Sequence, residues 1–170
     1  MSGTAGARPV ERGHFSDSFS EEVDCGDFAA LVEVDVDWAF VLNPHGRDRL
    51  AYGIETSHGR QLWTNLATGK TLTVDSNFVV KDLRVTHIGD GTLTILVQSA
   101  GGVNVYGPDG KLLLREPGLS RSLLLIGDGG TPTDPTDDVF LADLGRVKGS
   151  TGRNDLDGTD LCGVLRAHAA

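Results

Sequence analysis

The chain lacks the features that define several large classes of protein. Its 170 residues contain no run of 18 apolar residues, so we expect no membrane-spanning helix. Lysine and arginine form no cluster, and the net charge of −9 disfavours binding to the phosphates of a nucleic acid. We therefore expect neither a membrane span nor a nucleic-acid partner.

Motifs of catalysis and metal binding are also missing. The chain has no C-x-x-C, H-x-x-x-H or G-x-S-x-G pattern and no glycine-rich phosphate loop, so no catalytic residue is assigned. The acidic loops 128–138 and 149–160 hold oxygen ligands that suit Ca²⁺, but Arg153 and Val164 stand where an EF-hand needs acids. We predict solvated turns there, with no metal and no cofactor; a structural Ca²⁺ site is the alternative.

What remains is the composition of one folded, turn-rich domain. Hydrophobic residues make up 39% of the chain and charged residues 23%, which fits a globular protein. Glycine reaches 23 residues and Asp outnumbers Glu 18 to 6, a balance that favours turns over helices. We predict a flexible tail over residues 1–12 and a single domain over 13–170.

Alternation of apolar and polar residues predicts β-strands. Every even position of 32–42 is apolar, while Glu33, Asp35 and Asp37 fall between them. Successive side chains of a strand point to opposite faces, so this segment has one apolar and one solvated face. Shorter stretches of the same kind follow, separated by turn sequences such as GPDG at 107–110.

Short connections between such strands predict an all-β, antiparallel up-and-down meander. An open sheet leaves two unpaired edges, so we expect about 8–10 strands in a closed or nearly closed barrel, with a β-sandwich as the alternative. Thr136 can cap a short helix near 137–144. The segment 161–167 is expected to form a strand or a short helix.

The two cysteines, Cys25 and Cys162, lie near opposite ends of the predicted domain. No histidine stands at ligand spacing from either, so we predict a disulfide, with reactive thiols or metal ligands as the alternative. Disulfides persist in oxidising compartments, which favours a secreted protein. The N-terminus carries no secretory signal. We expect the natural signal to have been removed; a cytoplasmic origin is the alternative.

Turn motifs along most of the chain beyond residue 13 carry a resemblance. They are DCGD at 24–27, NLATGK at 65–70, GDGTLTI at 89–95, YGPDG at 106–110 and GGTPTDP at 129–135. The chain resembles a group of small secreted actinobacterial β-proteins of unassigned activity, and this resemblance implies no catalytic residues. At the level of fold alone, the expected architecture is similar to lipocalin-like and allene-oxide-cyclase-like barrels.

A small barrel is either filled by its own side chains or holds one small ligand. Mostly apolar side chains, with one histidine, are expected to line such an interior: Trp38, Phe40, Tyr52, Ile54, His58 and Phe78. We expect a small apolar molecule to bind there. The alternatives are a barrel-type isomerase or cyclase that uses the same cavity, and an extracellular structural or interaction domain with a filled core. Trp63 is expected to face outward.

Overall fold

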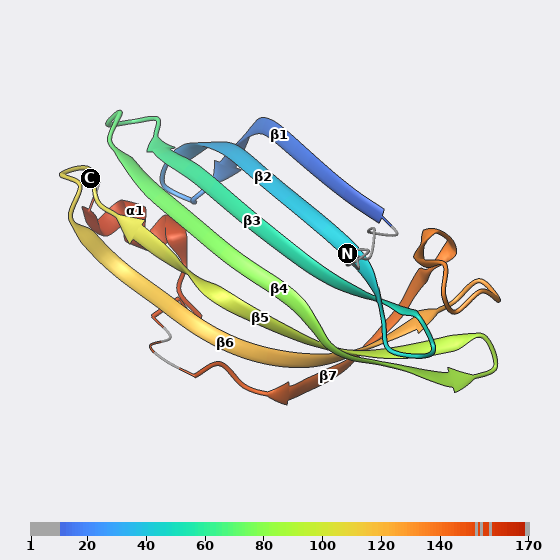
Figure 1. Ribbon diagram of the computed structural model, residues 1–170. Helices are drawn as coiled ribbons and strands as arrows, with labels where there is room; N and C mark the ends of the chain where they lie inside the picture. Colours follow the sequence, from blue (N-terminus) through green and yellow to red (C-terminus); the bar gives the residue numbers. More distant parts are fainter. Residues whose placement is uncertain (1–10, 152, 154, 157, 169–170) are drawn as a thin grey trace, which may run out of the picture.

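The computed structural model describes residues 11–151, 153, 155–156 and 158–168. Figure 1 shows one strongly curved sheet with a short helix at one end. The strands are β1 (Glu11–Asp24), β2 (Ala29–His45), β3 (Leu50–Asn65), β4 (Thr71–Gly89), β5 (Thr92–Tyr106), β6 (Leu112–Gly127) and β7 (Val139–Lys148). A 3₁₀ turn, η1 (Pro135–Asp137), precedes β7, and the helix α1 is Leu161–His168.

The predicted antiparallel up-and-down meander is confirmed. Each strand pairs with the next in the chain, in the order β1 to β7. Within the described residues, β1 and β7 do not pair with each other, so the sheet is not closed by hydrogen bonds. There are seven strands rather than 8–10 because several expected strand ends lie inside long strands. β4 continues through a bulge between Asp82 and Arg84, and β5 continues through 100–102.

The helix expected near 137–144 is wrong. Most of that segment belongs to β7, which pairs with β6 through a register broken by three bulges. Thr136 caps no helix; instead, the Asp134 carboxylate caps η1 by accepting a hydrogen bond from the Thr136 N–H at 3.1 Å. At the N-terminus, Glu11 and Arg12 belong to β1, and the rest of the expected tail, residues 1–10, lies outside the described residues.

Helix α1 covers one end of the sheet, beside the β3–β4 and β5–β6 turns (Figure 1). Asp160 starts the helix because its carboxylate accepts hydrogen bonds from the N–H groups of Cys162 and Gly163, both at 3.0 Å. Leu165 is completely buried. It packs with residues from the β1–β2 turn and from β2, β4 and β5: Cys25, Ala30, Leu72, Val74 and Val105. The sheet therefore curls around the helix.

Two further links tie α1 to the β1–β2 turn. Cys162 forms the predicted disulfide with Cys25, with the two Cα atoms 5.4 Å apart, which is compatible with an extracellular location. Arg166 donates hydrogen bonds to Asp27 at 2.6 Å and to the Cys25 carbonyl at 2.8 Å. The hydrogen bond from Arg166 lowers the pKa of the Asp27 carboxyl.

A second buried cluster closes the opposite end of the sheet. Its members are Leu50, Val85, Leu93 and Ile126, with Tyr52 packed beside them. Among the described residues, no apolar side chain in the middle of the sheet, between this cluster and the one under α1, is fully buried. The core is therefore split into two ends with an uncovered stretch of sheet between them.

Candidate ligand-binding face

One row of paired residues crosses the middle of the sheet. It consists of Phe15, Trp38, Ser57, Phe78, Gly101 and Gly118, each opposite the next in the neighbouring strand. Directly opposed side chains share a face. Alternation along β4 and β5 puts this row on the face of Val74 and Val105, the face on which α1 packs. We call it the inner face, and the opposite one the outer face.

Strands β1 and β2 give the middle of the inner face an aromatic surface. The Phe15 ring stacks on Trp38, with ring centres 5.3 Å apart, and on Phe40, at 6.1 Å. Phe15 remains 47% exposed, and Phe19, two positions along the same face, 51% exposed. Trp38 and Phe40 are half-buried. An exposed ring stacked on half-buried ones offers apolar surface to a ligand.

Next to this aromatic surface lies a cavity of about 300 Å³ with a more polar lining. Its floor comes from the inner faces of β4 to β7, and one wall comes from Ser150, Leu156 and Gly158 of the segment that leads to α1. The polar side chains in the lining are Ser99, Glu116, Ser120, Arg146 and Ser150. Phe78 also lines the cavity and joins it to the aromatic row. The middle of the inner face therefore has an aromatic half and a polar half.

The wall segment is fixed to β6. The Asp155 carboxylate accepts a hydrogen bond from the Arg115 backbone N–H at 3.1 Å, and the Thr151 N–H donates to the Leu119 carbonyl at 3.3 Å. Ser150 lies directly over Gly118: a Cβ on Gly118 would lie 2.4 Å from Ser150 Oγ and 3.6 Å from Ser150 Cβ. These contacts and the disulfide hold the wall at both ends.

One carboxyl group stands on the inner face next to the β4 bulge. Asp82 lies in β4, opposite Val97, and its Oδ2 accepts a hydrogen bond from the Gly53 N–H at 2.6 Å. Burial raises the pKa of Asp82, and the hydrogen bond from Gly53 offsets this in part. A carboxyl group with a raised pKa is suited to donating or accepting a proton.

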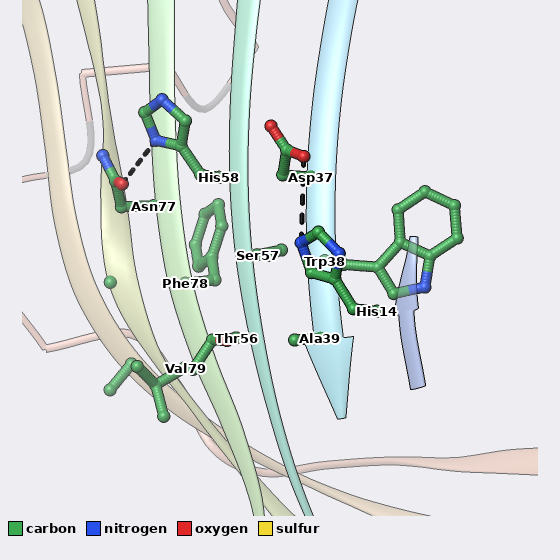
Figure 2. A pocket seen from close by; sticks show the side chains of 12 residues that line it. His14, Asp37, Trp38, Ala39, Thr56, Ser57, His58, Asn77, Phe78 and Val79 are labelled. Carbon is green, nitrogen blue, oxygen red and sulfur yellow. Dashed lines mark hydrogen bonds and ion pairs between the residues drawn. The ribbon is translucent and has the colours of Figure 1, made fainter. Parts of the chain in front are cut away.

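A second hollow, of about 450 Å³, is shown in Figure 2. Most of its lining residues belong to the outer face, but Trp38, Ser57, Phe78 and Gly101 of the row also line it. In it His58 points to Asn77, with Nδ1 2.6 Å from the amide oxygen, and His14 points to Asp37, at 4.0 Å. The Ser16 hydroxyl donates to the same Asp37 carboxylate. The serine therefore bonds to the acid and not to a histidine, so this group lacks the serine–histidine contact that activates a nucleophile.

Three of the six predicted site residues, Trp38, His58 and Phe78, line the hollow of Figure 2 together, and the other three do not line it. Trp38, Phe40 and Phe78 lie on the inner face, whereas Ile54 and His58 lie on the outer face, because Ser57 is the residue opposite Trp38 and Glu55 the residue opposite Phe40. Tyr52 belongs to the second buried cluster, and its hydroxyl accepts a hydrogen bond from the Val85 N–H at 3.1 Å.

Other expectations have mixed outcomes. Trp63 does not face outward; it packs against the cluster under α1. Phe15 and Phe19 were not predicted as site residues, although their spacing of four already places them on one face of a strand. Glu116 and Arg146, which reach the cavity from different strands, were not predicted either. Nothing in the local sequence around either one indicates this.

The acidic loop before β7 is partly buried. Asp128 is 1% exposed; its Oδ1 accepts a hydrogen bond from the Gly130 N–H and its Oδ2 lies 3.3 Å from His87 Nε2. Burial and the neighbouring charges of Asp137, Asp128 and Asp134 raise the pKa of Asp138. In the part of the chain that the structure describes, no three His, Cys, Asp or Glu side chains lie close enough together to hold a metal ion.

Comparisons with known proteins found no family model, no curated protein and no solved structure that matches the chain. Among the described residues, no helix is long and apolar enough to cross a membrane.

Proposed function

We propose that this protein is a secreted β-domain that binds one small apolar molecule along its inner face, against Phe15, Trp38, Phe40 and Phe78. The observation that carries the proposal is the stack of Phe15 on Trp38 and Phe40, in which the Phe15 ring stays 47% exposed. A domain with a filled core would bury these rings, since apolar burial contributes about 25 cal/mol per Å² to stability. The disulfide supports the secreted location.

The test is a titration with N-phenyl-1-naphthylamine, an uncharged probe whose emission rises in apolar surroundings. We expect saturable binding to the wild-type protein and weaker binding to Phe15→Ala. Phe15 is about half exposed, so a ligand can cover half of its side chain, worth about 1 kcal/mol or about fivefold in Kd.

Ile54→Ala is the matched control. Ile54 is 50% exposed, close to the value for Phe15, but lies on the outer face. We expect its Kd to stay within about twofold of wild type. If both variants weaken the probe equally, or if the probe does not saturate, the inner face is not a binding site.

A second candidate function, isomerisation of the bound molecule, is favoured by Asp82. Its carboxyl group is the inner-face acid whose pKa burial raises. The test incubates the molecule released from protein purified from its own host with fresh wild-type protein and with Asp82→Asn. Conversion to a product of unchanged mass by the wild type alone supports an enzyme, and identical chromatograms for both proteins rule it out.

A further inference from the structure

The cavity beside the aromatic surface contains two opposite charges that are not paired. Glu116 and Arg146 both line it, yet neither side chain has an ion pair or a hydrogen bond with another described residue. Glu116 is half-buried and Arg146 is exposed, so a charged group of a ligand can reach both side chains.

The pairing of the strands explains why the two charges stay apart. Arg146 lies opposite Ser122, six residues along β6 from Glu116. At about 3.3 Å per residue, their backbone positions differ by roughly 20 Å along the strand. The side chains therefore reach the cavity from its two ends. Ser120 lies between them on the same face of β6.

This arrangement discriminates between kinds of ligand headgroup. An anion beside Arg146 shares the cavity with the negative Glu116, and a cation beside Glu116 shares it with Arg146. A headgroup that carries both charges pairs with both side chains, and the hydroxyls of Ser99, Ser120 and Ser150 supply neutral hydrogen-bond partners. The net charge of the lining then matches the net charge of the headgroup.

We propose that the ligand is amphipathic, with an apolar chain against the aromatic surface and a zwitterionic headgroup in this cavity, its anionic part toward Arg146 and its cationic part toward Glu116. The inference rests on the proposed function, since it assigns the same ligand a polar end. It also gives Ser150, Leu156 and Gly158 a role, because they lie beside the headgroup and not beside the chain.

The experiment displaces N-phenyl-1-naphthylamine with four amphiphiles that share a twelve-carbon chain, each below its critical micelle concentration. They are dodecylphosphocholine, dodecanoate, dodecyltrimethylammonium and dodecyl maltoside. We expect the zwitterionic compound to bind about tenfold more tightly than the other three, the effect of one charge-assisted hydrogen bond.

Two variants test the assigned orientation. Glu116→Gln should strengthen binding of dodecanoate, and Arg146→Gln should strengthen binding of dodecyltrimethylammonium, each by about tenfold. Lys148→Gln is the matched control, since it removes an exposed charge from β7 at a residue that does not line the cavity. It should leave the order of the four compounds unchanged.

The outcomes separate this inference from the proposed function. If the probe binds but the four amphiphiles displace it equally, or dodecanoate or the maltoside matches dodecylphosphocholine, the headgroup assignment is overturned and the apolar site stands. The same holds if the two variants leave the preference of the wild type intact. If the probe itself does not bind, both proposals fail.

Discussion

Removing the Cys25–Cys162 disulfide should cost this protein a large part of its stability. The two cysteines are 137 residues apart in sequence, so the bond closes a loop over most of the chain. In the chain-entropy relation, a loop of that length lowers the entropy of the unfolded state enough to stabilise the fold by about 5 kcal/mol at 25 °C. Native domains have about 5–15 kcal/mol in total.

Most of this effect acts through the unfolded state, because other contacts also hold α1 in place. Leu165 is buried against the sheet, and Arg166 is bonded to Asp27 and to the Cys25 carbonyl. We therefore expect the double variant Cys25→Ala/Cys162→Ala to fold and to lose about 3–5 kcal/mol of unfolding free energy. Urea denaturation followed by tryptophan fluorescence measures this, and the m-value should rise as the unfolded chain expands.

Reduced wild-type protein is the matched control, since it loses the cross-link but keeps both cysteine side chains. It should fall close to the double variant. A loss below about 1 kcal/mol in both proteins would refute the reasoning, because it would mean that the unfolded chain is already held together by other contacts. A large loss in the double variant alone would assign the effect to packing around Cys25.

The remaining predictions concern single side chains. Leu165→Ala should cost about 2–5 kcal/mol in urea denaturation, whereas Leu144→Ala, on an exposed position of β7, should stay within about 0.5 kcal/mol. Gly101→Ala should strongly destabilise the sheet, since its Cβ would lie 2.0 Å from the Asn77 carbonyl oxygen; Gly149→Ala, whose Cβ meets open space, should be nearly neutral. Burial raises the pKa of Asp82, so its contribution to stability is present below its unfolded pKa of about 3.9 and is lost as pH rises through its folded pKa. Asp82→Asn should therefore raise the melting temperature at pH 7 and change it little at pH 3. The control Asp48→Asn, at an exposed position, should change the melting temperature little at either pH. A rise of equal size at both pH values would show that charge burial is not the cause.

The fold class followed from local pattern, and the strand count did not. Alternation over 32–42 reports directly which side chains share a face, because the period of a strand is two. The glycine pair Gly101-Gly102 reads as a turn in the sequence, yet it lies inside β5. There the absence of side chains lets β5 come close to β4 and β6. A turn and a close approach of two strands both require glycine, so composition alone does not separate them.

Which residues of one strand share a face was predictable from the sequence, but which residues of different strands share that face was not. Phe40 and Phe78 were assigned to apolar faces, and both lie on the inner face. Ile54 and His58 were assigned to the same interior, and a register that differs by one residue puts them on the other face. Register depends on which residues pair between β2 and β3, and no feature within either strand encodes that pairing on its own.

The distribution of side chains along the strands explains why the two ends of the sheet are cores and the middle is not. On the inner face, large aliphatic residues occupy both ends of β5, with Leu93 at one and Val105 at the other. Between them the same face carries Ile95, Val97 and Val103, but at its centre it carries Ser99 and Gly101, which have little or no side chain. A sequence selected for a filled core would place large apolar residues there, as it does at the ends. The small residues of β5 and β6 and the large aromatic residues of β1 and β2 thus form a matched pair. One side provides apolar surface and the other provides room, which is the arrangement that a bound chain requires and that internal packing alone does not.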